Sequence, residues 1–168
     1  MARGAPARRY WLLKSEPTSC SFQDLSAAPR RRTGWDGVRN YQARNLLRDE
    51  VHAGDLGLFY HSGVRDPGVA GIIRVARGAE PDPTQFDPRS ESFDPKSRRQ
   101  DPTWLQIVVE AVRELPVFVP LELLRTQTAL RGTPLLRRGQ RLSVQPVTEK
   151  EWRCVLELGG LPPDGFLT

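Results

Sequence analysis

The segment Trp-Asp-Gly-Val-Arg-Asn-Tyr-Gln-Ala-Arg-Asn at positions 35–45 concentrates side chains that are suited to binding a nucleobase. An aromatic face can stack on a base, an amide can hydrogen-bond to its edge, and an arginine can hold a phosphate. Trp35 stands between a polar loop and an Asp-Gly pair, which favours a pocket wall over the core. Asn40 either reads the edge of a base or caps a helix that begins at Tyr41. The segment therefore predicts a pocket for one planar, hydrogen-bonding group.

Arginine supplies almost all of the positive charge. Lysine occurs only at positions 14, 96 and 150, so 22 of the 25 basic residues are arginine, and the net charge is +5. Arginine forks match the geometry of phosphates, although a genome rich in G and C would produce the same bias. We expect Lys14, Arg39 and Arg44 to contact phosphates. The alternative for these arginines is a solvated basic face, and we prefer that alternative for Arg48.

Further candidates for the pocket lie in or beside expected strands. Trp104 is a second stacking candidate, although a place in the core is as well supported by the sequence. Ser143 and Gln145 alternate with apolar residues and so share one face, which either lines the pocket or faces water at a sheet edge. The complete set of predicted pocket residues is Ser15, Trp35, Asn40, Tyr60, His61, Ser62, Trp104, Leu142, Ser143 and Gln145.

Neither a catalytic triad nor a metal site is supported by the spacing of reactive residues. His61 and Ser62 are neighbours in an expected strand, so their side chains point to opposite faces. Cys20 and Cys154 are far apart and have no partner at a spacing typical of metal ligands. We therefore expect a non-catalytic protein without a cofactor or metal.

The elements that position these residues are short and mostly extended. Strands are expected at 10–14, 56–61, 69–77, 104–115 and 142–145, with the last one ended by Pro146. Helices are expected at 21–25, from 40, at 120–125 and from 148. The first and the last of these begin with Ser or Thr three residues before an acidic residue, which suggests a capping box. Residues 29–33 read as an arginine-rich loop, and residues 80–103 read as a functional flap or a partly disordered connection. The pattern favours a small, curled α+β barrel.

The bulk properties favour a single domain. We expect a domain at 9–160, a flexible extension at 1–8 and a C-terminal tail at 161–168. No apolar run approaches the roughly 20 residues that span a bilayer, and the N-terminus lacks the apolar segment of a signal peptide. We expect a cytoplasmic monomer that does not bind membranes.

Five segments resemble the EVE domain family, and they occur in the order of that family. They are 10–17, 35–45, 59–62, 81–84 and 141–148, and the resemblance covers roughly residues 9–158. It implies a PUA-like fold, a curved β-barrel with short peripheral helices. It also implies a non-catalytic reader of a modified base, with modified cytosine in DNA favoured and RNA as an alternative. Gly63 departs from the pattern, because asparagine is common there, and this puts one polar contact at the rim of the pocket in doubt.

Two other functions remain open at this point. The first is a small PUA-like hydrolase acting on modified nucleosides, with Lys14, Glu16 and His61 as acid–base groups. The second is an adaptor that docks a protein partner through residues 80–103.

Overall fold

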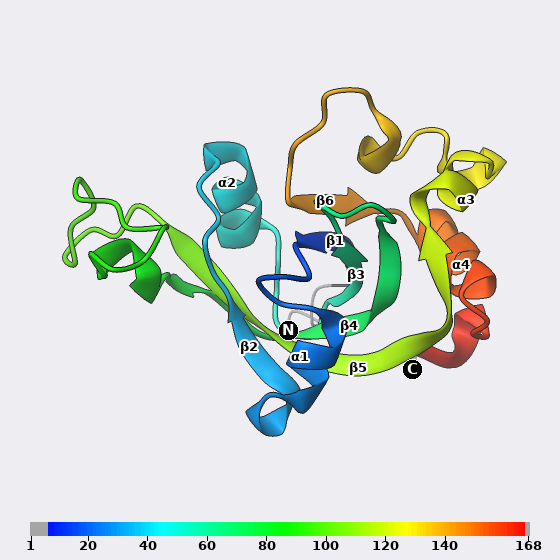
Figure 1. The fold of residues 1–168 in the computed structure, drawn as a ribbon, viewed down its shortest axis with the longest axis horizontal. Coiled ribbons are helices and arrows are strands. Elements are labelled where there is room, and N and C mark those ends of the chain that lie inside the picture. Colours follow the sequence, from blue (N-terminus) through cyan, green and yellow to red (C-terminus); the bar gives the residue numbers. More distant parts are fainter. Residues whose placement is uncertain (1–6, 167–168) are drawn as a thin grey trace, which may run out of the picture.

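The computed structural model describes residues 7–166, and within this range six strands form a single sheet (Figure 1). The strands are β1 (Tyr10–Ser15), β2 (Arg32–Trp35), β3 (Leu56–His61), β4 (Gly68–Pro81), β5 (Leu105–Pro120) and β6 (Val144–Val147). The α-helices of the described residues are α1 (Phe22–Ala27), α2 (Tyr41–Asp49), α3 (Leu121–Arg125) and α4 (Glu149–Leu158). The extension at 1–6 and residues 167–168 lie outside the described part.

The sheet is mixed and strongly curved. Its order is β2-β5-β4-β3-β1-β6, with β1 and β3 parallel and every other pair antiparallel. The long strands β4 and β5 shift register at several points along their pairing, and such bulges bend a sheet and increase its twist. The prediction of a curved α+β fold is confirmed. The expected barrel is not closed, because β2 and β6 are the two edges of the sheet and do not pair with each other.

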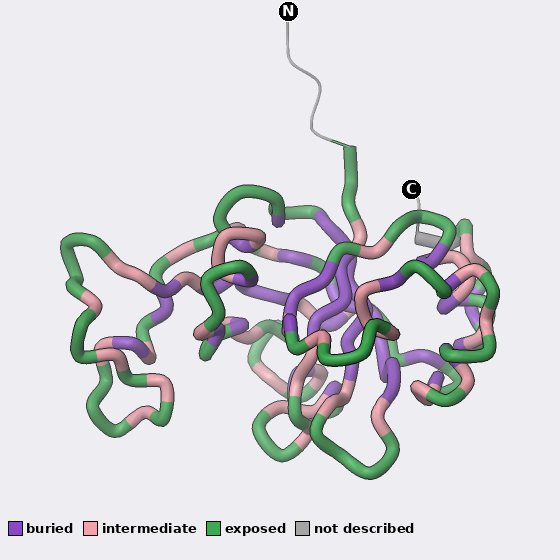
Figure 2. Tube along the Cα trace, turned by 90° about the horizontal axis from the view of Figure 1, so that it is seen from above, coloured by how far each residue is buried: buried purple, intermediate pink, exposed green. Residues whose placement is uncertain are grey.

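Side chains of β1 alternate between two hydrophobic clusters. Leu13 belongs to the first cluster together with Trp35 and Phe59, whereas Leu12 belongs to the second together with Trp152. Helices α1 and α2 contribute apolar residues to the first cluster, and α3 and α4 contribute to the second. Figure 2 shows that the buried backbone gathers along the centre of the molecule. The sheet is therefore covered by helices on both faces.

The helix starts follow the predicted capping patterns. Ser21 and Asp24 form a reciprocal capping box at α1, and Thr148 and Glu151 form another at α4. The Asn40 side chain accepts a hydrogen bond from the backbone amide of residue 43 and so caps α2. These three predicted starts are confirmed.

Two strands differ from the prediction. Residues 32–35 form β2, where only a loop was expected, because pairing with β5 imposes an extended backbone on a sequence without a strand pattern. The last strand begins at Val144 rather than at Leu142, and Pro146 lies inside it. Proline is tolerated there because β6 is an edge strand and one side of its backbone needs no partner.

The connection between β4 and β5 is a hydrogen-bonded lobe at residues 82–104, drawn in green at the left of Figure 1. Gln85 organises this lobe from its interior. Its side-chain amide donates to the carbonyl oxygens of Asp82 and Trp104, and its oxygen accepts from Ser97 and the amide of Trp104. The lobe is thus held together by internal polar contacts.

Replacement of Gly71 by alanine tests the contact between α1 and the sheet. A Cβ at this position in β4 would lie 2.5 Å from the Phe22 ring, which is fully buried. We expect Gly71→Ala to lower the free energy of unfolding by about 1–3 kcal/mol, because the ring cannot move without disturbing the core. The measurement is urea unfolding. Gly132→Ala is the matched control, since its Cβ would meet no atom within 4 Å. Equal stability of the two variants would contradict this packing.

Candidate functional site

A cavity of about 480 Å³ opens between the two edges of the sheet. This volume lies in the range of sites that hold small ligands. Edge strand β2 contributes Thr33, Gly34 and Trp35, and Ser143 comes directly before the other edge strand, β6. The remaining lining residues end β1, follow β1 or β2 in the chain, or belong to the lobe: Lys14, Ser15, Glu16, Ser19, Cys20, Asp36, Gly37, Val38 and Ser92. The gap that keeps the barrel from closing is therefore where the cavity lies.

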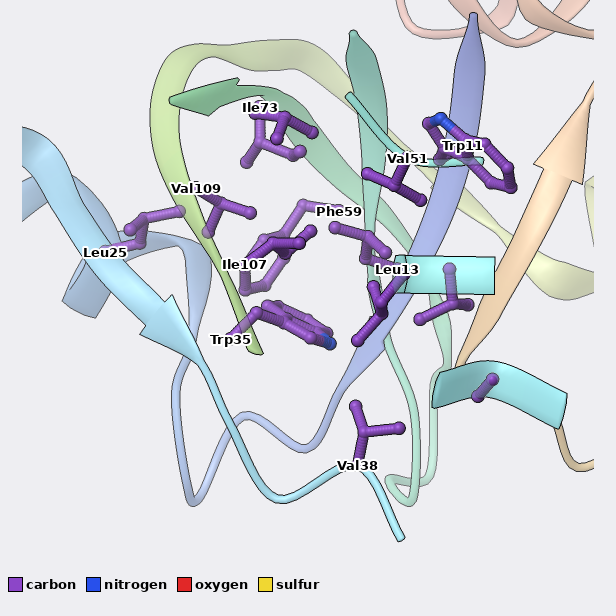
Figure 3. Packing of buried hydrophobic residues seen from close by; sticks show 14 of the residues in the cluster. Trp11, Leu13, Leu25, Trp35, Val38, Val51, Phe59, Ile73, Ile107 and Val109 are labelled. Atoms are coloured by element: carbon purple, nitrogen blue, oxygen red, sulfur yellow. The ribbon is translucent and has the colours of Figure 1, made fainter. Parts of the chain in front are cut away.

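Trp35 forms the aromatic wall. Its pairing with Ile107 of β5 fixes the strand, and its ring meets Phe59 edge-on at 5.8 Å. Figure 3 shows the indole beside Leu13 and Ile107, with Val38 facing it from the next segment of the chain. Trp35 is only 7% exposed, so it serves both as core and as cavity wall.

Contacts between β1 and its neighbours hold the polar floor of the cavity. The backbone amide of Lys14 donates to the carbonyl of Ser143 at 2.9 Å, which extends the pairing of β1 with β6 to the cavity. The hydroxyl of Ser15 donates to the carbonyl of Cys20 at 2.7 Å, so its proton is already used within the protein. Burial lowers the pKa of the Lys14 ammonium group.

Two acidic residues, Glu16 and Asp36, also line the cavity, and sequence reasoning had not placed Asp36 there. Asp36 is exposed to solvent as a residue, but partial desolvation in the cavity raises the pKa of its carboxyl group, and the negative charge of Asp82 raises it further, against the opposing effect of Arg39. The signal was present in the sequence, because Asp36 directly follows Trp35 in the segment that first indicated a pocket.

The buried carboxylate of Asp82 fixes the segment that carries Asp36. It accepts hydrogen bonds from the amide of Gly37 at 2.8 Å and from Arg39 at 2.9 Å, and both the amide and the hydroxyl of Thr84 donate to it. Burial alone would raise the pKa of Asp82, but these hydrogen bonds outweigh it and hold the pKa below its usual value. Asp82 thereby ties the lobe to the wall of the cavity.

The guanidinium groups of Arg39 and Arg44 are committed to protein partners. Beyond Asp82, Arg39 donates to the carbonyl of Ser92 and to the hydroxyl of Thr84. Arg44 donates to the side chain of Asn45 and to the carbonyl of Thr103. The prediction that these two arginines hold phosphates therefore finds no support in the geometry, because their donors already have acceptors.

Trp104 lies outside the lining of the cavity. Its ring packs against Tyr41 with 4.9 Å between centroids and the two planes tilted by 34°, and its indole nitrogen donates to Asp94 at 2.7 Å. Arg39 lies over its face at 5.4 Å. The structure thus uses Trp104 to join the lobe to α2, where a second stacking wall had been expected.

The other predicted pocket residues have structural positions apart from the cavity. Tyr60 and Leu142 are buried, Tyr60 in the second cluster and Leu142 in the first, and Asn40 caps α2. The imidazole nitrogen Nε2 of His61 accepts from the amide of Phe22 at 3.2 Å, and burial lowers the pKa of this imidazole. The backbone amide of Ser62 donates to the carbonyl of Ser15. Gln145 is fully buried, and its side-chain amide donates to the carbonyl of Leu142.

Of the thirteen residues expected to bind a base or a phosphate, the structure brings Lys14, Ser15, Trp35 and Ser143 together around the cavity. These four come from three separate stretches of the chain. Arg39, Asn40 and Arg44 share the 35–45 segment with Trp35, and Leu142 and Gln145 flank Ser143 closely in the chain, but Tyr60, His61, Ser62 and Trp104 have no lining residue beside them in the sequence.

The EVE domain family model matches residues 9–158. The chain belongs to the EVE domain family. Thymocyte nuclear protein 1 of mouse is 41% identical over 176 residues, covering 95% of this chain and 77% of the relative. A crystal structure of human THYN1 protein in complex with 5-methylcytosine containing DNA superposes with a TM-score of 0.85 at 40% identity, covering 90% of this chain and 97% of that one. A protein from Pseudomonas putida has a TM-score of 0.85 at 43% identity, covering 89% and 99% of the two chains.

The expectation of a cytoplasmic protein is wrong by this comparison, because the mouse, chicken and human relatives are named as nuclear proteins. The lack of a secretory segment, on which that expectation rests, does not distinguish compartments inside the cell. No helix among residues 7–166 has the length and apolar character needed to cross a membrane.

Replacement of Asp82 by asparagine tests the anchor of the cavity wall. We expect Asp82→Asn to lower the free energy of unfolding by about 2–4 kcal/mol at pH 7, because Arg39 loses its buried counter-charge. The pKa of Asp82 is lowered on folding, so its stabilising effect is present above about pH 4 and is lost as the pH falls through the folded-state value. Urea unfolding at pH 7 and pH 3 should give a difference between variant and parent that shrinks at the lower pH. A constant difference would contradict the role of the charge.

Proposed function

We propose that this protein binds single-stranded or flipped-out DNA carrying a modified cytosine, and holds that base in the cavity between β2 and β6. The observation that carries the proposal is the cavity itself, which combines one aromatic wall with a convergent set of polar groups. The similarity of this chain to human THYN1 protein, whose structure was solved in complex with 5-methylcytosine containing DNA, supports cytosine as the base and DNA as the polymer.

The binding free energy at such a site depends on stacking against Trp35 and on burial of the methyl group of the base. Stacking on Trp35 would contribute about 1–3 kcal/mol and would tolerate any base. A buried methyl group adds only about 0.8 kcal/mol, which corresponds to roughly a fourfold preference. Recognition of cytosine itself must therefore come from hydrogen bonds to the edge of the base rather than from the methyl group.

Asp36 is the group best suited to read that edge. Cytosine presents an exocyclic amine donor beside a ring nitrogen acceptor, and a carboxyl group can accept from the amine. The protonated carboxyl could also donate to the ring nitrogen, which matches both positions at once. Burial and the charge of Asp82 raise the pKa of Asp36 and so favour this form. Two other charged residues, Lys14 and Glu16, line the same cavity. The positive charge of Arg39 lowers the pKa of Asp36 and so opposes the increase.

A cavity-filling substitution tests the site. Short single-stranded oligonucleotides with one cytosine or one 5-methylcytosine are titrated by fluorescence anisotropy. We expect about fourfold tighter binding of the methylated strand. Ser143→Gln, which places a larger side chain on the cavity rim, should weaken binding of both strands at least tenfold and remove the preference.

Ser26→Gln is the matched control, because Ser26 lies on α1 outside the cavity lining. The proposal fails if Ser143→Gln binds like the parent, or if the parent does not distinguish the two strands. Recovery of altered bases or free nucleosides from the incubated strands would instead support the hydrolase alternative, for which His61 is poorly placed because it bonds to Phe22.

The protonation of Asp36 predicts a pH dependence. If the protonated carboxyl binds the base, affinity rises as the pH falls from 7.5 toward the raised pKa of Asp36. Asp36→Asn presents one acceptor and one donor at every pH, so it should bind at pH 7 at least as tightly as the parent and lose the pH dependence. Asp36→Leu should bind at least tenfold more weakly. Titrations between pH 7.5 and 5.5 measure this, and a parent affinity independent of pH would rule out the protonated form.

A further inference from the structure

Three arginines without side-chain partners stand on the segment that leads into the cavity. Arg137, Arg138 and Arg141 are exposed, and within residues 7–166 no hydrogen bond, ion pair or ring contact engages their side chains. They precede Ser143, which lines the cavity. Figure 1 shows this segment descending to the start of β6, beside α2. The guanidinium groups are thus free and close in the chain to the proposed base site.

This stretch of the chain is rich in arginine and lacks acidic residues. Residues 123–148 contain five arginines and no acidic residue, whereas the basic segment around Arg39 and Arg44 is balanced by Asp82 and by protein carbonyls. An arginine whose donors already have acceptors gains little from a phosphate, because it must first give up those bonds. A free guanidinium fork has only bound water and counterions to lose.

The segment contains a hydrogen-bonded turn and is anchored to the sheet at its C-terminal end, which restricts where its arginines can lie. A turn bonds the amide of Gln140 to the carbonyl of Arg137, with Gly139 at a positive φ of 75° that glycine adopts without strain. The side chain of Gln140 accepts from the amide of Leu142, which is buried in the first cluster. The carbonyl of Ser143 then accepts from Lys14. The turn therefore has a fixed relation to the cavity.

We infer that Arg137, Arg138 and Arg141 form the phosphate-binding surface of this protein, and that they hold the sugar–phosphate backbone on either side of the base in the cavity. This inference rests on the proposed function for the placement of the base. It replaces the expectation that Arg39 and Arg44 hold the strand. In this arrangement the cavity reads the base, and the turn binds any single strand irrespective of sequence.

The test is the salt dependence of binding by Arg137→Gln/Arg138→Gln/Arg141→Gln. Each phosphate contact to a single strand contributes about 0.7 to the slope of log K against log salt, so the slope should fall by about two units. The cytosine and 5-methylcytosine strands should weaken by the same factor. Binding of the free nucleoside 5-methyl-2′-deoxycytidine should not change, because it has no phosphate.

The matched control is Arg65→Gln/Arg113→Gln/Arg125→Gln, which removes the same charge from three exposed arginines outside the cavity lining. Its slope should change by less than half a unit. Equal slopes for the parent and the first variant, or an equal loss in both variants, would overturn the inference. A parent that shows a steep slope but no preference for the methylated strand would count against the proposed base site alone. Melting temperatures equal to that of the parent verify that both variants are folded.

Discussion

The buried carboxylate of Asp82 is the interaction on which the rest of the site depends. It accepts four hydrogen bonds from three residues, and these residues belong to the lobe and to the segment after β2. The segment after β2 carries Asp36 and Val38, which line the cavity. An isolated ionised carboxylate is costly to bury, so this one stays buried only while its donors remain in place. The Asp82 network therefore couples the shape of the cavity to the folding of the lobe, although the lobe itself contributes only Ser92 to the lining.

The second constraint is that the sheet does not close. Pairing between β2 and β6 would satisfy two open edges, and exposed edges are a liability in a soluble protein. The protein instead keeps β2 short and places Pro146 in β6, which limits pairing with another strand. The space left between the edges receives side chains from both, and Trp35 covers the core beneath it. A recess lined by the ends of several strands results from curvature without closure, and this recess is the site proposed here for the base.

Local patterns in the sequence predicted most of the fold, because caps and alternating strands act over a few residues. The capping residues Ser21, Asn40 and Thr148 all start helices as expected. The sequence did not predict β2, since its extended form depends on β5, more than seventy residues away. Dependence on residues that are distant in the sequence also explains why only part of the site was predicted. Trp35 was predicted from its neighbours in the sequence, but the ion pair of Arg39 with Asp82 and the ring contact of Tyr41 with Trp104 are long-range contacts that no local pattern indicates.

Base recognition and strand binding differ in their physics, and the proposed arrangement separates them in space. A methyl group in a cavity changes the binding free energy by about 0.8 kcal/mol and responds little to salt. Contacts of arginine with phosphates can change the affinity by orders of magnitude with salt and carry no information about the base. Placing a strong charge inside the cavity would bind every nucleotide and dilute the small preference for a modified one. In the proposed arrangement, the one lysine of the lining, Lys14, shares the cavity with the carboxyl groups of Glu16 and Asp36, and the free arginines stand on a turn outside it, so the two contributions stay independent.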